Sequence, residues 1–284
     1  MRDEDPLTVS TLMDRMRGYH LKIEEAIKVE LDRYEESNFY GSLRYALEGG
    51  KRIRPIILLL SAESIGRSDA NPLPVAVAVE LLHTESIIHD DILDSEILRR
   101  DRPAFHIRYG MGASLLTADF VFGMILDIAS RYEDKRIARE LSSVALRMCK
   151  GEFGELKIDP KTYRLEWGEY INMIAQKTAS LFEASAKMGG IIGGGKNDEI
   201  RALSDYGYML GISYQIQDDI LDWGKEDKMA SALKIEGEDD KMSYLKKMSE
   251  IYAIRAKQGL NVLRDTKAKK HLLDLADFII SHQF

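Results

Sequence analysis

Residues 83–103 read HTESIIHDDILDSEILRRDRP, and this stretch decides how the chain folds. Leu, Ile and Glu dominate its first half and a proline turn at residues 71–74 precedes it, which predicts one helix over residues 75 to about 97. At about 3.6 residues per turn, one face of that helix carries His83, Ser86, Ile87, Asp90 and Asp94. Carboxylates one turn apart repel each other unless they share a partner, and their hard oxygen atoms suit Mg2+. A single motif of this kind is more often a solvated helix face.

A second copy of the pentapeptide DDILD changes that balance. It occurs at residues 90–94 and again at 218–222. On a helix predicted over residues 198–224, the spacing places Gln215, Asp218 and Asp222 on one stripe. If the two helices face each other, six carboxylates converge on one cavity, and only cations relieve their repulsion. The pair of motifs therefore predicts two metal-binding walls around a diphosphate.

A basic cluster supplies the positive charge that such a substrate needs. Lys51, Arg52 and Arg54 follow Gly49-Gly50 and crowd the start of the next predicted helix. Positive charge at a helix amino terminus opposes the helix dipole, so a partner is expected. A phosphate group there would gain from the helix end and from charge-assisted hydrogen bonds.

The spacing of the remaining residues indicates an all-α protein. Apolar residues recur at intervals of three and four, and no useful length of chain alternates Val, Ile and Thr with polar residues. The predicted helices beyond the two DDILD helices cover residues 9–36, 38–48, 105–131, 135–154 and 164–193, with glycines 189–190 and 193–195 closing the last. Nothing in the composition requires a second domain, so we expect one domain over residues 1–284.

Composition excludes several functional classes. The chain has 47 acidic and 40 basic residues and a net charge of −7, so nucleic acid is not an expected partner. Its one cysteine, Cys149, suits a reducing cytoplasm and is expected to pack as a small apolar residue. The acidic amino terminus does not resemble a secretory signal, and no apolar run approaches the roughly 20 residues of a membrane span. We expect a cytoplasmic protein without stable membrane insertion.

The chain resembles the all-trans isoprenyl diphosphate synthases, the polyprenyl synthetase family. The resemblance rests on GGKRIRP at 49–55, the stretch 83–103, GEFGE at 151–155, QKTASLF at 176–182 and YQIQDDILD at 214–222. It implies the isoprenoid synthase fold, a bundle of long, mostly antiparallel helices around a central cavity. It also implies a Mg2+-dependent, dimeric prenyltransferase that condenses isopentenyl diphosphate with an allylic diphosphate, giving a product of about fifteen to twenty carbons.

The resemblance also implies a role for each matching residue. The magnesium ligands would be Asp90, Asp94, Asp218 and Asp222. Arg99, Lys177 and Gln215 would contact the allylic diphosphate, and Thr178 and Gln215 would stabilise the carbocation through their dipoles. The isopentenyl diphosphate site would consist of Lys51, Arg54, His83 and Arg100. Among these, Asp90, Asp94, Arg99, Lys177 and Asp218 would act directly in catalysis.

Two departures from the family pattern leave alternatives open. A lysine-bearing loop that the family carries after Gly224 is absent between about Lys228 and Ser231, which keeps a non-catalytic regulatory subunit among the hypotheses. Glu85 stands where the family often has an aromatic residue that limits product length, and we expect it to pair with a lysine or arginine. Phe120 or Met124 would then form the floor of the cavity, although residues of this kind are more often ordinary core residues.

Two other classes of helical protein remain as alternative functions. A class I terpene cyclase shares the carbocation chemistry but does not need the isopentenyl site. A di-iron helical bundle needs two ExxH motifs, and Glu80 to His83 is the one that the sequence contains.

Overall fold

The computed structural model of the protein describes residues 9–159, 161–222, 232–235 and 240–281. The helices are α1 (Val9–Asp32), α2 (Tyr40–Leu47), α3 (Ile53–Ile65), α4 (Leu73–Leu93), α5 (Phe105–Tyr109), α6 (Met111–Ser130), α7 (Lys135–Glu155), α8 (Trp167–Ile174), α9 (Ser180–Ile192), α10 (Asn197–Leu221), α12 (Lys241–Gly259) and α13 (Lys267–Ser281). A π-helical turn, Ala175–Ala179, joins α8 to α9, and a 3-10 turn, Leu260–Val262, follows α12. The expected all-α fold is confirmed.

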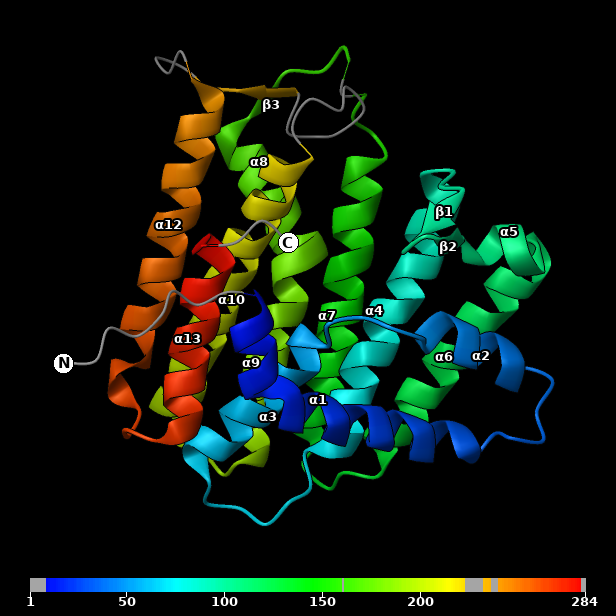
Figure 1. The fold of residues 1–284 in the computed structure, drawn as a ribbon, viewed down its shortest axis with the longest axis horizontal. Helices are drawn as coiled ribbons and strands as arrows, with labels where there is room; N and C mark the ends of the chain where they lie inside the picture. The colour runs from blue at the N-terminus through cyan, green and yellow to red at the C-terminus, as the bar shows by residue number, and fades with distance from the viewer. Residues whose placement is uncertain (1–8, 160, 223–231, 236–239, 282–284) are drawn as a thin grey trace.

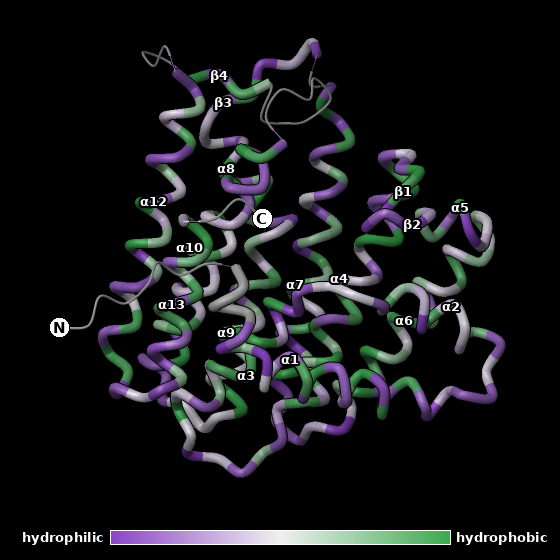
Figure 2. The backbone as a smooth tube through the Cα atoms, viewed as in Figure 1, coloured by the Kyte–Doolittle hydropathy of each residue, from purple (hydrophilic) through white to green (hydrophobic). Residues whose placement is uncertain are grey.

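The long helices stand side by side and surround the middle of the molecule. In Figure 1, α12, α10, α7 and α4 run up the view, and α1 lies across the lower part of the bundle. Helix α10 packs on both α9 and α12, and α4 packs on α6. Hydrophilic and hydrophobic residues alternate along helices such as α12, as the sequence pattern predicts for amphipathic helices (Figure 2).

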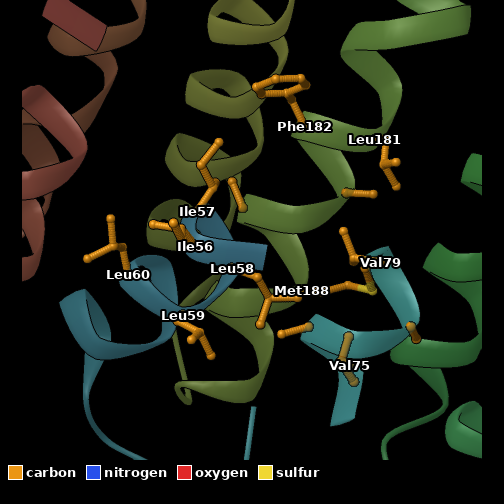
Figure 3. Close-up of a cluster of buried hydrophobic side chains, with 14 of the residues drawn as sticks. Ile56, Ile57, Leu58, Leu59, Leu60, Val75, Val79, Leu181, Phe182 and Met188 are labelled. Carbon is orange, nitrogen blue, oxygen red and sulfur yellow. The ribbon is translucent and has the colours of Figure 1, made fainter. Parts of the chain in front are cut away.

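The core forms where α3, α4 and α9 meet. Figure 3 shows Ile56 to Leu60 of α3 beside side chains of α4 and α9, among them Val75, Phe182 and Met188, and all of these residues are buried. The helices can approach closely because Gly189 has no side chain. A methyl group placed on it would lie 2.3 Å from the carbonyl oxygen of Leu58. The expectation that Gly189-Gly190 ends a helix is wrong, since both glycines lie inside α9, whereas the expected end at Gly193 is confirmed because this residue is the C-cap of α9.

Helix α4 ends earlier than the sequence predicts. It stops at Leu93, and Asp94 occupies its C-cap. The chain then forms a hairpin in which β1 (Leu98–Arg99) pairs antiparallel with β2 (Arg102–Pro103). Arg100 and Asp101 make the two-residue turn with φ values of 53° and 58°, as a type I′ turn requires. The predicted extension to about residue 97 is wrong because Ser95, with a φ of 53°, leaves the right-handed helical conformation directly after the C-cap.

Two other predicted helices are interrupted. Gly110, with φ of 83°, separates α5 from α6 inside the range 105–131. The range 164–193 begins with β3 (Leu165–Glu166), which pairs in parallel with β4 (Leu233–Lys234), and the π-helical turn lies in its middle. Single π turns inside α-helices are frequent at functional sites.

Helix α6 is more apolar than the sequence analysis allowed. By length and composition alone it could cross a membrane, and it is the one helix in the described ranges that passes this test. In the structure 39% of the apolar segment of α6 is buried. Asp127 of the same helix forms an ion pair with Arg131. The buried face, which includes Val121 and Ile125, belongs to the main core.

Candidate active site

The predicted site residues gather around one cavity of about 720 Å3 that α4, α7, the π-helical turn and α10 enclose. The predicted residues that line it are Arg54, His83, Asp90, Asp94, Arg99, Arg100, Lys177, Thr178, Gln215, Asp218 and Asp222. Lys51 is not among the lining residues; burial lowers the pKa of its ammonium group, and the Asp218 carboxylate partly restores it. The expected meeting of the two DDILD helices at one cavity therefore occurs.

The first aspartate wall is electrostatically crowded. Burial raises the pKa of Asp90 to about 7, and Glu152 and Asp94 add to this effect while Lys177 opposes it. A side-chain hydrogen bond with Glu152 contributes to the raised pKa of Asp90. This wall therefore carries more negative charge than its lysine neutralises.

Asp91, the second of the three aspartates in the first motif, has a structural role. Its side chain is buried, and it accepts hydrogen bonds from Nε and Nη2 of Arg99 at 2.8 and 2.5 Å. These contacts hold the hairpin against α4. The predicted contact between Arg99 and the allylic diphosphate stays a prediction, although Arg99 does line the cavity.

Lys177 is held by carboxylates that the sequence analysis did not assign to the site. Its Nζ lies 2.6 Å from an oxygen of Glu152 and 2.6 Å from an oxygen of Glu155. Burial lowers the pKa of Lys177, but Glu155, Asp90 and Glu152 outweigh this effect and raise it. The GEFGE motif carried the signal for both glutamates, because their spacing of three places them on one face of a helix.

A chain of hydrogen bonds crosses from the π-helical turn to α10. The Thr178 hydroxyl donates to Oε1 of Gln215 at 2.7 Å, and the Gln215 amide donates to Asp219 at 3.0 Å. The Tyr170 hydroxyl donates to the other oxygen of Asp219 at 2.5 Å. Burial raises the pKa of Asp219 to about 6 against the lowering effect of these two bonds. Tyr170 and Asp219 were missed, although Asp219 is the second letter of the DDILD motif.

Another part of the cavity wall is cationic. Nη1 of Arg54 lies 3.2 Å from Nε2 of His83, and its guanidinium group stacks 4.7 Å from the centre of the Phe182 ring. Nη1 of Arg100 donates to the Glu48 carbonyl oxygen at 3.3 Å. Burial, followed by Arg54 and Arg100, lowers the pKa of His83 well below its usual value, so this ring is neutral and can donate or accept.

The apolar end of the cavity differs from the prediction in three respects. Glu85 pairs with His89 at 3.3 Å rather than with a lysine or arginine, because the histidine is one helical turn away on α4. Phe122 lines the cavity, whereas Phe120 stacks on Phe39 and Met124 is buried in the core. Cys149 is exposed on the cavity wall rather than packed.

The family model for polyprenyl synthetases matches residues 36–270 of this chain. The chain belongs to the polyprenyl synthetase family. It is 30% identical to the geranylgeranyl diphosphate synthase of Methanosarcina mazei, over 98% of this chain and 100% of that protein. It is 33% identical to the farnesyl diphosphate synthase of Geobacillus stearothermophilus, over 78% and 80% of the two chains.

Solved structures agree with this family. The geranylgeranyl pyrophosphate synthetase of Pyrococcus horikoshii superimposes with a TM-score of 0.86 and 29% identity, covering 96% of this chain and 99% of that one. The expectation of a prenyl diphosphate synthase of the short-chain type, with the isoprenoid synthase fold, is confirmed at the level of the family.

The loop after Gly224 falls outside the described residues. The alignment with the Methanosarcina mazei synthase extends over 325 positions, which is more than the 284 residues of this chain. That member of the polyprenyl synthetase family therefore carries segments that this chain lacks.

The carboxylates of this polyprenyl synthetase suit Mg2+ that is bound together with a phosphate-bearing substrate. Within the ranges that the structure describes, no group of three His, Cys, Asp or Glu side chains is arranged to hold one ion. Mg2+ in phosphate-binding enzymes is usually held by one or two carboxylates, and the substrate phosphates supply further oxygen ligands. Two separate aspartate walls with a gap between them match this requirement.

Proposed function

We propose that this member of the polyprenyl synthetase family condenses isopentenyl diphosphate with an allylic diphosphate. One observation carries the proposal: two aspartate-bearing helices and a cluster of cationic side chains line the same cavity. The names of the curated relatives, geranylgeranyl and farnesyl diphosphate synthases, support a product of about fifteen to twenty carbons. A cytoplasmic location is proposed with it.

One group of cavity residues would act on the allylic diphosphate. Asp90 and Asp94 on one wall, with Asp218 and Asp222 on the other, would hold Mg2+. Bound Mg2+ would neutralise the charge that develops on the departing diphosphate, which lowers the barrier to an allylic carbocation. Lys177 and Arg99 would add positive charge to the same leaving group.

The second substrate completes the bond. Lys51, Arg54, His83 and Arg100 would hold isopentenyl diphosphate so that its double bond is aligned with the cation and attacks it. The proton that is then lost passes to the released diphosphate. The dipoles of Thr178 and Gln215, fixed by their mutual hydrogen bond, would stabilise the cation during this step.

A homodimer is proposed to cover the apolar outer face of α6. Leu115, Leu116 and Leu126 are between 50% and 58% exposed there. A second copy of the chain suits this face better than lipid, because the same helix carries Asp119 and Asp127 and charged groups are costly in a membrane. Light scattering should give a mass of two chains for the unaltered protein, and the Leu116→Glu variant should have the mass of one chain. A monomeric unaltered chain would contradict this proposal.

The activity is tested with the purified chain, Mg2+, isopentenyl diphosphate and dimethylallyl, geranyl or farnesyl diphosphate. Chromatography of the dephosphorylated products should reveal elongated all-trans alcohols, and omission of Mg2+ should abolish them. No elongation with any of the three would refute the proposal. A cyclic hydrocarbon would indicate a terpene cyclase, and activity that appears only with a copurified homologue would indicate a regulatory subunit.

A further inference from the structure

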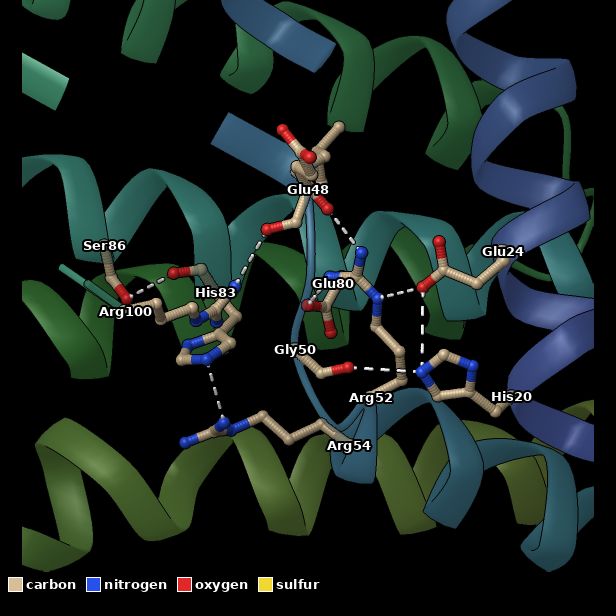
Figure 4. Close-up of polar contacts among 11 residues, drawn as sticks. His20, Glu24, Glu48, Gly50, Arg52, Arg54, Glu80, His83, Ser86 and Arg100 are labelled. Carbon is tan, nitrogen blue, oxygen red and sulfur yellow. Dashed lines mark hydrogen bonds and ion pairs between the residues drawn. The ribbon is translucent and has the colours of Figure 1, made fainter. Parts of the chain in front are cut away.

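Arg52 lies between two of the cations assigned to isopentenyl diphosphate, yet its side chain is buried, with an exposed fraction of 3%. Its Nε donates to Glu24 at 2.7 Å and its Nη1 donates to Glu80 at 2.5 Å, while Nη2 donates to the carbonyl oxygen of Leu47. Figure 4 shows this guanidinium group between α1 and α4, turned toward the two carboxylates. Its charge is thus neutralised inside the protein.

The backbone of Arg52 is held in an uncommon conformation. Its φ of 53° and ψ of 31° place it in the left-handed region at the N-cap of α3, which costs free energy for a residue other than glycine. Gly49 and Gly50, immediately before Lys51, also have positive φ. The three side-chain contacts of Arg52 fix this turn, and the turn sets the direction in which Lys51 and Arg54 leave it.

The same contacts connect the turn to the rest of the cationic pocket. Glu80 lies one helical turn before His83 on α4, and His83 contacts Arg54. His20 of α1 contacts the Gly50 carbonyl oxygen at 3.2 Å. The guanidinium group of Arg100 lies so close to Gly50 that a methyl group there would come within 3.2 Å of it. Arg52 therefore joins α1, α2 and α4 to the loop that presents Lys51.

We propose that Arg52 is a positioning residue for isopentenyl diphosphate: its buried contacts with Glu24, Glu80 and Leu47 hold the 49–54 turn so that Lys51 and Arg54 meet that substrate. The proposal rests on the proposed condensation reaction. It assigns Arg52 no contact with either substrate. Its loss should weaken isopentenyl diphosphate binding selectively, because the aspartate walls that receive the allylic substrate lie on other parts of α4 and on α10.

The test compares the Michaelis constants for the two substrates in four variants. Arg52→Met should raise the KM for isopentenyl diphosphate about tenfold or more, with a change of about twofold or less in the KM for the allylic substrate. Arg52→Lys should behave similarly, because one ammonium group cannot reproduce the planar fork. Glu24→Gln removes the more exposed partner and should give a smaller increase in the same constant, which keeps the proposal testable if Arg52→Met fails to fold.

Arg131 offers a matched control. It also bridges two acidic side chains, donating to both oxygens of Glu30 on α1 at 2.8 and 2.6 Å and contacting Asp127, but it is not part of the 49–54 turn. Arg131→Met should lower the melting temperature and leave both KM values unchanged. Equal increases of both KM values in Arg52→Lys and Glu24→Gln, or no increase, would overturn the positioning role alone. An unaltered chain without prenyl transfer would instead overturn the proposed function and this inference with it.

Discussion

Gly151 of α7 lies directly against the backbone of Lys177 in the π-helical turn. A methyl group on Gly151 would come within 2.5 Å of the Lys177 nitrogen and 2.9 Å of its α carbon. The absence of a side chain at position 151 is therefore what allows α7 to meet the turn, and this contact sets the distance from Lys177 to Glu152 and Glu155. The position of the lysine is determined by backbone packing as well as by its ion pairs.

Gly151→Ala should displace Lys177 and reduce both stability and turnover. Overpacking typically costs about 1–3 kcal/mol, and a displacement of about 1 Å can cost on the order of a hundredfold in rate. Gly154→Ala is the matched control, since nothing lies within 4 Å of a methyl group there. That variant should melt at the same or a slightly higher temperature and keep its activity. Thermal unfolding and steady-state rates of the two variants test this expectation. A fully active Gly151→Ala variant would refute the packing argument.

Phe122→Ala should lengthen the product by at least one isoprene unit. Phe122 lines the cavity while being 42% exposed, so its removal enlarges the apolar end with little effect on the core. Phe120→Ala removes the same group two residues earlier, where the ring stacks on Phe39 at 4.6 Å and meets Tyr34 edge-on at 5.3 Å. It should lower the melting temperature without changing the product. Chromatography of the product alcohols separates the two outcomes, and identical product profiles would show that Phe122 does not limit chain length.

Glu199→Gln should weaken the protein in a pH-dependent way. Glu199 accepts hydrogen bonds from Nη1 and Nη2 of Arg67, both at 2.5 Å, and from the Lys196 nitrogen, and these contacts lower its pKa to about 2. A carboxyl group with a lowered pKa stabilises the folded state above its usual value of 4.5, and this contribution is lost as the pH falls toward 2.

The melting temperature of Glu199→Gln should therefore lie a few degrees below that of the unaltered chain at pH 7, on the order expected for losing one charged hydrogen-bond network. The difference should shrink steadily below about pH 4.5. Arg67→Met should give a similar loss, and the double variant should lose less than the sum because the two residues share one interaction. A pH-independent difference would rule out this assignment.

The repeated DDILD motif made the active site predictable, because helical periodicity alone places both aspartate stripes. The end of α4 was not predictable in the same way: Arg100 and Asp101 adopt positive φ in a hairpin although neither is glycine. Helical spacing correctly placed Asp90 and Asp94 on the cavity side, but it could not show that Asp91 binds Arg99, because that contact forms only once the hairpin has folded back.

The apolar wall was the least predictable part of the site. Helix α6 is apolar on several faces, so the sequence could not decide whether Phe120, Phe122 or Met124 meets the cavity; neighbouring helices decide it. The basic cluster was recognised from residues 51–54, and the family resemblance assigned Arg54 rather than Arg52 to the substrate. The burial of Arg52 could not be predicted, because it depends on Glu24 and Glu80, which lie on two other helices.

The two adjacent aspartates of the first motif should respond oppositely to neutralisation. Burial and neighbouring carboxylates disfavour the charged form of Asp90, so Asp90→Asn should melt at the same or a higher temperature than the unaltered chain in metal-free buffer at pH 8. Mg2+ with inorganic diphosphate should raise the melting temperature of the unaltered chain, because ligands that bind only the folded state stabilise it, and Asp90→Asn should lose most of this increase.

Asp91→Asn is the control for that measurement. Its carboxylate is buried and paired with Arg99, so its neutralisation leaves a guanidinium group without a charged partner and should lower the melting temperature without ligand. Mg2+ and diphosphate should still raise the melting temperature of this variant, because the ligands proposed for the metal remain. If Asp90→Asn kept the full increase while Asp91→Asn lost it, the metal would have to be assigned to the middle aspartate of the motif.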